Sequence, residues 1–594
     1  MRDPNIQSWN LDQAEIQFQG EGSSHELAPL LVTECIQQSL HHLKQPFFIL
    51  FLDAKSAFDV VLKELLIKNL FAGTSGETLL YLDSRLGSRQ TFLDWNGQLM
   101  GPIADEQGVE QGGVNSSDFY KVFGKEQLAS AQASSLGVPL GPITVSGVGL
   151  ADDTGLLTNS IQDLLNLLHL TIQFCSKYQV QLCSDKTKLL VYHGKEMSEK
   201  VEYSKGINPI KINDEEIKFT EAAEHVGLIR STSGNLPSIL ANITAHKRAL
   251  GAVLHTGMAC AHRGNPAASL CIQQMYANSV LFSGIGALVL HDQEVSIITQ
   301  HHKKTISNLQ RLIPLTPRAV IFFLAGTLPG EAFLHLRQLS IFGMVSRLPD
   351  NLLHHHASNI FSFTTTSSKS WMHGIRDLCL MYSLPHPTIL LSTPPSKEKF
   401  KNLVKKHVTD YWEQALRAEA SPLSSLEFFQ PEFMSLSTPH PLWTTSASCP
   451  TKTVMATVQA RLLSGRYRTE ALCSNWSNSL GLCKVSPNCN VVEDIPHMMT
   501  CQGLSDTRDK LYAFTTAYCD DHPLVAEVVQ NYINKKCRLF IQFLLKCSTL
   551  PDVILLVYIM FNITRLWCYC LHRDRLKKYW GGGETLLRPE NLLF

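Results

Sequence analysis

Residues 46–61 have the sequence PFFILFLDAKSAFDVV, and its pattern indicates the class of fold. An apolar run from Phe47 to Leu52 is typical of a strand that is buried on both faces of a sheet. Asp53 follows this run directly, so we expect its carboxylate to project from the end of the strand. The helical pattern VVLKELLIKNLF comes next. This alternation predicts an α+β or α/β module over roughly the first 230 residues.

A second acidic feature lies at residues 145–157, which have the sequence VSGVGLADDTGLL. Two apolar stretches flank Asp152 and Asp153, and this pattern predicts a hairpin with the paired acids at its turn. Adjacent carboxylates repel each other, and a bound cation relieves the repulsion. Oxygen ligands at strand ends suit Mg²⁺, and two such ions can promote an in-line phosphoryl displacement. The alternative is that both acids serve only as turn residues.

Two further motifs accompany the acids. Residues 108–122 have the sequence GVEQGGVNSSDFYKV, in which Gln111-Gly112-Gly113 and Ser116 predict a glycine turn that opens a helix. Such a turn allows close approach of a ligand, and a helix start favours phosphate. Farther along, YQVQLCSDKTKLLVY places Lys186 before a strand-like run, and EHVGLI supplies a turn at Gly227.

The charge of the chain is zero overall but uneven along its length. The 594 residues hold 52 Lys and Arg against 52 Asp and Glu, and 44% of them are hydrophobic. This composition excludes a disordered or collagen-like protein, and the length predicts three or more domains. Residues 1–230 carry 18 basic and 29 acidic side chains, whereas residues 231–594 carry 34 and 23. The asymmetry indicates contact with nucleic acid or a membrane.

The sixteen cysteines are scattered, and the first residues, MRDPNIQSWN, lack the pattern of a signal peptide. We therefore expect reduced thiols, no disulfide framework and an intracellular protein. The apolar run Val553–Phe561 has nine residues, whereas a transmembrane helix needs about 20. The run therefore predicts a buried helix and no membrane partner.

Taken in order, these motifs resemble the reverse transcriptase domain of non-LTR (LINE-type) retrotransposons. FLDAKSAFDVV is similar to the first catalytic motif of that family, GVEQGGVNSS to its QG-x-x-x-S motif, and LADD to its paired-aspartate motif. SDKTKL resembles the lysine motif that follows, and HVG resembles the turn that leads to the thumb. QFQGEGSSHELA and LYLDSRLGSRQTFLDWNGQ also resemble segments of the family. The resemblance implies an α+β right-hand polymerase palm with partial fingers, a helical thumb and a mostly helical C-terminal region.

The resemblance also implies catalytic roles. Asp53, Asp152 and Asp153 match the three acids that bind two Mg²⁺ ions in the family. Lys186 matches a lysine that assists proton transfer to the leaving pyrophosphate. The implied reaction is DNA synthesis from dNTPs on an RNA template, in which the 3′-hydroxyl of a DNA primer attacks the α-phosphate.

Four other residues match substrate-binding positions. Phe58 matches an aromatic gate that excludes ribonucleotides, although its pattern also fits a core Phe. Gln111, Gly112 and Ser116 lie in the motif that contacts the template and the incoming nucleotide.

Two departures from the family bear on activity. Only 52 residues precede Asp53, so we expect an N-terminally truncated element without most of the fingers. Glu110 stands where the family usually has Arg, which reverses a charge beside the template path. Positioning and charge neutralisation supply most of the catalysis in phosphoryl transfer. A catalytically inactive nucleic-acid-binding protein and a scaffold therefore remain open as alternatives.

The rest of the chain divides by composition. Residues 1–230 are expected to form the palm with partial fingers, and residues 231–382 a thumb-like helical region. Two Pro-rich stretches, SLPHPTILLSTPPSK and LSTPHPLWTTSASCPTK, indicate linkers among connecting helices in 383–470. A Cys/His segment spans 471–505, and a basic helical tail spans 506–594. We expect a ribonucleoprotein of the nucleus and cytoplasm.

The Cys/His segment contains Cys483, Cys489, His497 and Cys501 with the spacing C-x5-C-x7-H-x3-C. Three thiolates and one imidazole can complete a tetrahedral Zn²⁺ site, and H-x3-C places two ligands on one helical face. Many non-LTR elements carry a similar cluster, usually with C-x2-C. A zinc-knuckle-like site and a merely apolar cluster both remain open. The run NITRLWCYCLHRDRLKKYW in the tail suits either single-stranded nucleic acid or a packed amphipathic helix.

Overall fold

The structure is a computed structural model of the chain. It describes residues 26–510, 513 and 571–575, except for gaps at 72–73, 75, 88–89, 105–106, 111–112, 114, 151–152, 195–209, 256–263, 350–351, 364–369, 427–428, 430, 432–433, 447–449, 468, 476–479 and 487. The chain divides into two compact units. The first comprises 1–241, 282–294 and 334–404, and the second comprises 242–281, 295–333 and 405–594.

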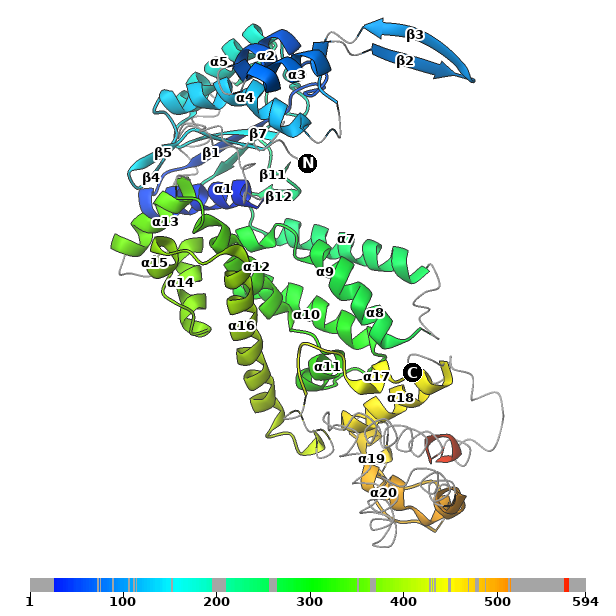
Figure 1. The fold of residues 1–594 in the computed structure, drawn as a ribbon. Helices are drawn as coiled ribbons and strands as arrows, with labels where there is room; N and C mark the ends of the chain where they lie inside the picture. The colour runs from blue at the N-terminus through cyan, green and yellow to red at the C-terminus, as the bar shows by residue number, and fades with distance from the viewer. Residues whose placement is uncertain are drawn as a thin grey trace. The chain divides into compact units, whose positions relative to one another are not determined.

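Helices and strands alternate up to residue 231, as the sequence predicts (Figure 1). In chain order they are α1 (Leu27–Gln37), the π-helix η1 (Gln38–Leu43), β1 (Phe47–Leu52), α2 (Lys63–Phe71), α3 (Gly76–Gly87), β2 (Gln90–Trp95), β3 (Gln98–Ala104), α4 (Ser116–Ala133), β4 (Val138–Leu140), β5 (Ile143–Val145), β6 (Gly147–Leu150), β7 (Asp153–Thr158), α5 (Ile161–Tyr178), β8 (Lys188–Tyr192), β9 (Lys211–Ile212), β10 (Glu215–Glu216), β11 (Ala222–His225) and β12 (Leu228–Ser231).

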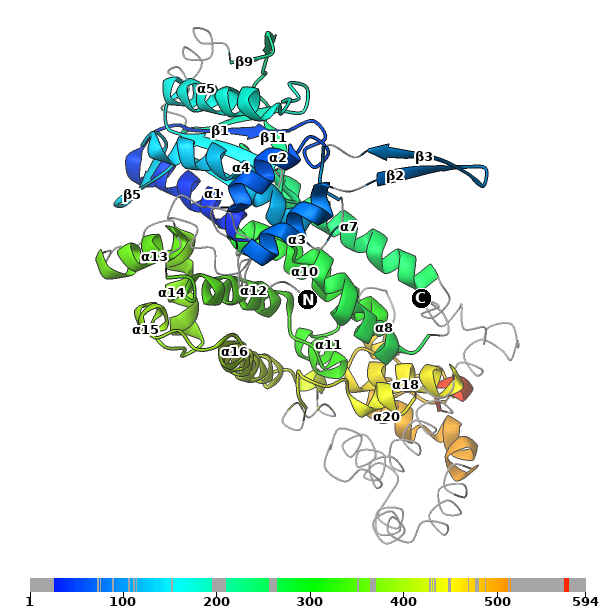
Figure 2. The ribbon, with the colours of Figure 1, turned by 45° about the horizontal axis from the view of Figure 1, so that its top comes forward.

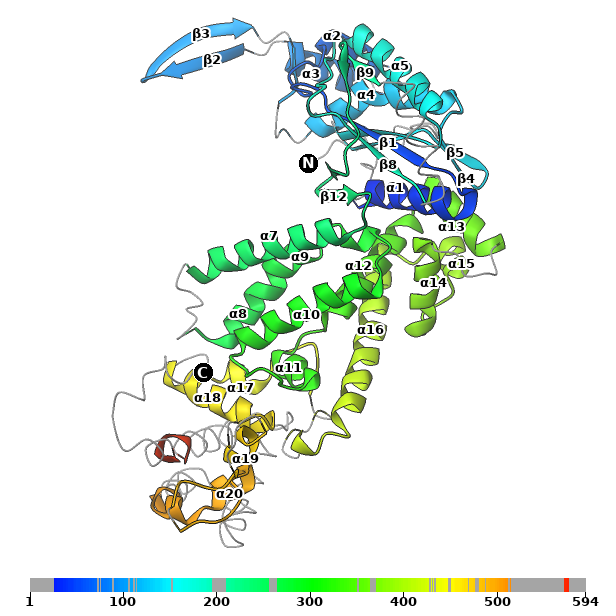
Figure 3. The ribbon, with the colours of Figure 1, turned by 180° about the vertical axis from the view of Figure 1, so that it is seen from behind.

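A four-stranded antiparallel sheet with the strand order β6-β7-β1-β8 is the centre of the first unit. All six residues of β1 are buried, because helices and loops cover both faces of this strand. The helix α5 runs along one face of the sheet, as Figure 2 shows, and α1 lies on the opposite face, as seen in Figures 1 and 3. The apolar run that begins at Phe47 is therefore the predicted central strand.

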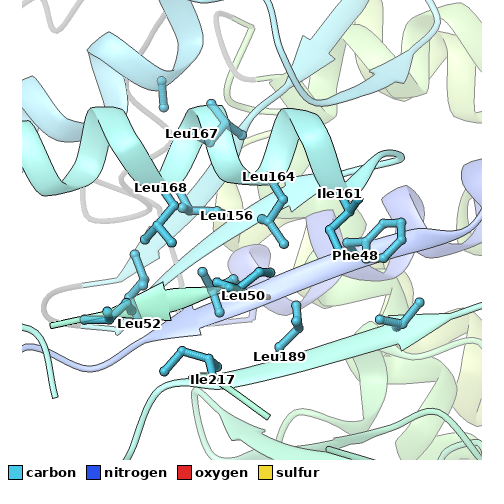
Figure 4. Packing of buried hydrophobic residues seen from close by; sticks show 14 residues of the cluster. Phe48, Leu50, Leu52, Leu156, Ile161, Leu164, Leu167, Leu168, Leu189 and Ile217 are labelled. Atoms are coloured by element: carbon cyan, nitrogen blue, oxygen red, sulfur yellow. The ribbon is translucent and has the colours of Figure 1, made fainter. Parts of the chain in front are cut away.

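Alternate residues of β1 form the core beneath α5. Phe48 and Leu50 point toward Leu164 and Leu168 of the helix, together with Leu156 of β7 (Figure 4). This packing follows from the period of two in a strand and the i, i+3, i+4 spacing of apolar residues in an amphipathic helix. Ser160 caps the start of α5, where its hydroxyl accepts a hydrogen bond from the backbone N–H of Asp163.

A second apolar cluster joins α2, α3, α4 and α5. Its aromatic centre is formed by Phe123, Phe174 and Tyr178, whose rings pack edge-on or stacked with centroids 4.6–6.1 Å apart. The hairpin of β2 and β3 contrasts with this core, because Trp95 and Leu99 on it are 73% and 74% exposed.

The described chain after residue 231 is helical, as the sequence predicts for 238–347. The elements are α7 (Leu236–His255), α8 (Pro266–Ile272), the π-helix η3 (Gln273–Ala277), α9 (Asn278–Leu281), η4 (Ile285–Ala287), α10 (Asp292–Leu309), α11 (Arg318–Ala325), α12 (Gly330–Val345), α13 (Leu352–Phe363), α14 (Trp371–Met381), α15 (Pro387–Ser392), α16 (Lys397–Ala420), η5 (Ser424–Leu426), α17 (Pro441–Thr444), α18 (Pro450–Leu463), α19 (Glu470–Cys473), α20 (Ile495–Thr500) and η7 (Gln502–Leu504).

The two Pro-rich stretches that indicate linkers contain the short helices α15 and α17. Each helix begins at its proline, Pro387 or Pro441, which suits the first helical turn because that position needs no N–H donor.

Among the described residues, no single helix is long and apolar enough to span a membrane, although the bent pair α11 and α12 meets the length and composition criteria together. The apolar run 553–561 lies outside the described residues.

Candidate active site and metal centre

Two of the predicted acids lie at the same edge of the central sheet. Asp53 directly follows β1, and Asp153 is the first residue of β7, which pairs with β1 in antiparallel register. The last registered pair joins Leu52 to Thr154, so the next residue of each chain segment is an aspartate. The β6–β7 pairing of Leu150 with Asp153 confirms the predicted hairpin, although Asp153 lies in the paired strand and not, as predicted, in the turn. Asp152 lies outside the described residues.

Lys186 approaches the same carboxylate from a neighbouring loop. Its Nζ lies 3.6 Å from Oδ2 of Asp53. Backbone hydrogen bonds hold the two loops together, because Cys183 N–H donates to the Asp53 carbonyl and Lys55 N–H donates to the Gln181 carbonyl, both at 2.8 Å. These bonds hold the segment after β1 against the residues that precede β8, which include the SDKTK sequence.

The Asp53 carboxylate fits a cation. Its Oδ2 atom is buried and accepts no hydrogen bond from the described residues, while the side chain as a whole stays 38% exposed. A buried carboxylate oxygen without a hydrogen-bond donor is costly unless a cation compensates it. Lys186 supplies one positive charge at 3.6 Å. Asp153 is exposed at the adjacent strand end, so its carboxylate is accessible to an ion from solvent.

The glycine motif lies beside the segment that follows β1. Gly108 N–H donates to the Val61 carbonyl and Val109 N–H donates to the Phe58 carbonyl, each at 2.9 Å. Gly108 has φ +88°, and a Cβ there would come within 3.1 Å of the Asp59 carbonyl oxygen. A glycine is therefore required at the point where the two segments meet.

Phe58 is half-buried in this assembly, with its ring centroid 5.1 Å from that of Tyr120 on α4. Ser116, the first residue of α4, is buried, and its hydroxyl donates to the Glu110 carbonyl. This bond links Glu110 to the first residue of α4. Gln111 and Gly112 lie outside the described residues.

The HVG motif forms the turn between β11 and β12. Val226 and Gly227 have φ values of +51° and +73°, the combination that a two-residue type I′ hairpin turn requires. The ring of His225 stacks on Phe51 of β1 at 4.7 Å, so the hairpin lies against the sheet. Burial, together with the nearby charge of Arg230, lowers the pKa of His225 to about 3.

The four Cys/His residues come together in the second unit. Their ligand atoms all lie within 4.8 Å of one another, with Cys483 Sγ 3.7 Å from Cys501 Sγ and Cys489 Sγ 3.3 Å from His497 Nε2. A tetrahedral Zn²⁺ site with Zn–S bonds of about 2.3 Å requires S–S separations of about 3.8 Å. The donor set and spacing therefore fit a structural zinc ion.

Local hydrogen bonds accommodate the wide C-x5-C gap. Cys483 N–H donates to the Val491 carbonyl at 2.9 Å, and Cys489 N–H donates to Ser486 at 3.0 Å, so the gap folds into a closed loop. Asp494 caps α20 by accepting from His497 N–H at 2.6 Å. Burial raises the pKa of the Cys483 thiol to about 12, so a cation is needed to hold the thiolate.

A buried ion pair next to this cluster was not predicted from the sequence. Arg575 donates from Nε and Nη2 to the two oxygens of Glu493, each at 2.7 Å. In the sequence, Glu493 lies between the cluster residues Cys489 and His497. Its side chain is fully buried, and its carboxylate also accepts a hydrogen bond from Glu470 N–H at 2.9 Å. The pair joins residues 571–575 of the tail to the Cys/His segment. The basic composition of the run around Arg575 was the only feature of the sequence that pointed to an ion pair of this residue.

Comparison with known proteins supports the assignment of the first unit. Residues 11–220 match the family model described as reverse transcriptase (RNA-dependent DNA polymerase). No curated protein matches the chain. Similar solved structures include telomerase from Candida albicans in complex with a fragment of telomeric RNA, with 13% identity, a TM-score of 0.31, and coverage of 63% of this chain and 58% of the telomerase.

Apo telomerase from Candida tropicalis is similar at 11% identity and a TM-score of 0.29, with coverage of 64% of this chain and 57% of that one. The chain thus spans less than two thirds of either telomerase. The matched segment contains Asp53, the paired aspartates and Lys186. Residues 11–220 are therefore a reverse transcriptase domain.

Proposed function

We propose that this chain is an RNA-directed DNA polymerase of the non-LTR retrotransposon type. The observation that carries the proposal is the position of Asp53 and Asp153 at adjacent strand ends, with Lys186 3.6 Å from Asp53. The motif order in the sequence supports the non-LTR subtype. The strand-rich part of the first unit corresponds to a palm, and the helices after residue 231 provide a thumb.

In this proposal Asp53, Asp152 and Asp153 hold two Mg²⁺ ions. When bound there, the ions supply charge neutralisation for the attacking primer 3′-hydroxyl and the leaving pyrophosphate. Lys186 is proposed to donate a proton to the pyrophosphate, and its position 3.6 Å from the Asp53 carboxylate supports this role. Phe58 lies in the segment between β1 and α2, five residues after Asp53, where a ring would crowd a ribose 2′-hydroxyl.

The Cys/His cluster is proposed to bind one Zn²⁺ ion with a structural role. Four protein ligands leave no open coordination position, which is typical of structural sites. The ion would fix the loop 483–491 and α20, on which His497 lies. RNA, DNA primer and dNTPs are the proposed partners of the polymerase unit.

The test is incorporation of dNTPs on a homopolymer RNA template with a DNA primer and Mg²⁺. We expect the wild type to extend the primer, and Asp53→Asn and Asp152→Ala to lose at least about a hundredfold in rate, since they remove charge at the reacting phosphate. Asp83→Asn on the exposed face of α3 is the matched control and should retain full activity. Equal incorporation by all four proteins would overturn the catalytic assignment.

A second candidate function is RNA binding without catalysis. Glu110 favours the loss of catalysis, because its exposed carboxylate beside the glycine motif would repel the phosphates of an incoming nucleotide, while basic residues elsewhere in the chain could still hold RNA. Binding of the primer–template by wild type and Asp53→Asn alike, with no extension by either protein, is the result that identifies this function.

A further inference from the structure

The first half of α16 carries an unusual concentration of positive charge. Residues 397–406, KEKFKNLVKK, contain five lysines and one glutamate. Lys397, Lys399, Lys401, Lys405 and Lys406 are all exposed. Among the described residues, none of the five lysines forms a salt bridge, whereas Lys177 and Lys484 pair with Glu126 and Glu470. The α16 lysines are therefore available to a partner from solvent.

The arrangement of these lysines opposes the stability of the helix. Lys397, Lys401 and Lys405 follow one another at i, i+4 and i+8, so they form a row of like charges about 6 Å apart along the axis. The row also begins at the helix N-terminus, where the macrodipole disfavours cations. Of the acids in the C-terminal half, Glu413 pairs with Arg417 and Glu419 pairs with Arg318, so these two carboxylates do not offset the lysines of the first half. A bound polyanion would relieve both sources of repulsion.

The chemistry of the helix surface selects the kind of polyanion. Phe400, Val404 and Val408 of α16 are buried. The exposed side of its first half therefore offers the five lysines, Asn402 and the single acid Glu398, without an exposed aromatic residue. A helix that binds a lipid surface needs an exposed apolar face, and base stacking needs exposed aromatics. Contact with the phosphodiester backbone needs only cations at regular spacing. The long single helix that presents the row is seen in Figures 1 and 3.

We propose that residues 397–406 of α16 form a sequence-independent binding surface for the phosphate backbone of nucleic acid. The row of Lys397, Lys401 and Lys405 extends over about 12 Å. A duplex of nucleic acid carries several phosphates over this length. The surface is distinct from the Asp53 site, and its binding requires neither Mg²⁺ nor dNTPs. It holds a nucleic acid by charge alone, whether or not the polymerase is active.

The test compares two variants of the full chain with equal changes of charge. One variant replaces the row by Lys397→Gln, Lys401→Gln and Lys405→Gln. The control variant replaces three scattered exposed lysines by Lys68→Gln, Lys211→Gln and Lys218→Gln. Fluorescence anisotropy measures binding to a 20-base-pair RNA duplex and to an RNA–DNA hybrid between about 50 and 200 mM salt, without Mg²⁺.

We expect the row variant to bind both nucleic acids at least about tenfold more weakly at low salt. The plot of log K against log salt concentration should become less steep, with the magnitude of its slope smaller by about two to three. A loss on only one of the two probes also supports the proposal and identifies the nucleic acid. The thermal midpoint of the row variant should equal or exceed that of the wild type, since repulsion within α16 is removed. This result shows that the weaker binding does not come from unfolding.

Two results would overturn the proposal. One is an affinity and a salt slope for the row variant that match those of the control variant. The other is unchanged nucleic-acid binding by the row variant together with lost binding to vesicles containing phosphatidylserine, which would assign the lysines to a lipid surface. Failure of the Asp53→Asn polymerase test has no bearing on either measurement, because binding is assayed without substrates.

Discussion

The bond between Arg575 and Glu493 allows a sharp prediction about the second unit. The Glu493 side chain is fully buried and that of Arg575 is 7% exposed, with two hydrogen bonds of 2.7 Å between them. Arg575→Met leaves the carboxylate buried without its counter-charge. Removing one partner of a buried ion pair typically costs about 3–5 kcal/mol. The guanidinium also lies over the Tyr467 ring at 5.6 Å, a contact that the variant loses.

The expected effect is local as well as global. A cost of about 3 kcal/mol raises the population of the opened Cys/His segment by at least about a hundredfold, since each 1.4 kcal/mol is a factor of ten. Hydrogen exchange measures this directly, because the N–H groups of Ala471, Cys483 and Glu493 are all bonded within the segment. Their protection should fall about a hundredfold in Arg575→Met.

Arg573→Met is the matched control. Arg573 pairs with Asp574 at 2.9 Å, but its side chain is 38% exposed. An exposed pair contributes about 1 kcal/mol or less, so protection should change little. Adding Glu493→Gln to Arg575→Met should restore part of the protection, because the uncompensated charge is removed. Equal exchange in Arg575→Met and Arg573→Met would refute the reasoning, since it would mean that burial adds nothing to the Arg575 pair.

Two further predictions concern metal and pH. Purified wild-type protein should contain about one zinc ion per chain and Cys489→Ser markedly less, as measured by elemental analysis; a wild type without zinc contradicts the proposed site. Burial lowers the pKa values of His225, His302 and His440 from 6.5 to about 3, so these rings stay neutral in the folded chain. Below pH 6.5 the unfolded chain binds protons at these histidines that the folded chain does not bind. The contribution of these histidines to the free energy of unfolding is therefore complete above pH 6.5 and is lost as the pH falls toward 3. Each histidine should contribute about 1.4 kcal/mol per pH unit within this window. The urea midpoint, measured at pH 7, 6 and 5, should fall at each step, and a flat profile would contradict the burial of these rings.

Local patterns in the sequence predicted much of the sheet edge that carries Asp53 and Asp153. The buried strand before Asp53, the hairpin around the paired aspartates and the turn at Gly227 each depend on neighbouring residues, so their patterns are visible in a single stretch. That these stretches lie together in space could be predicted only from their resemblance to a family. The register of β1 with β7 and β8, which places Lys186 beside Asp53, depends on pairings between segments more than 100 residues apart.

Buried polar contacts between distant segments left no pattern to find. His356 illustrates this, because three consecutive histidines gave no reason to assign a role to one of them. The structure buries His356 and places its Nε2 2.7 Å from Glu34, 322 positions away. Such pairs arise from tertiary packing, and neither partner is distinguishable by local composition from a solvent-exposed residue.

The Glu34 contacts show that the core of the first unit extends beyond the segment that matches the reverse transcriptase family. Glu34 lies on α1, inside the segment that matches the reverse transcriptase family, and its partners His356, Ser370 and Trp371 lie outside it. The carboxylate is buried, and the bonds from these three residues hold its pKa below its ordinary value against the effect of burial. Without α13 and α14 the same carboxylate would be buried without donors or would force α1 away from the sheet. The segment that matches the family ends at residue 220, but the buried Glu34 within it is held by residues of 334–404, which belong to the same compact unit.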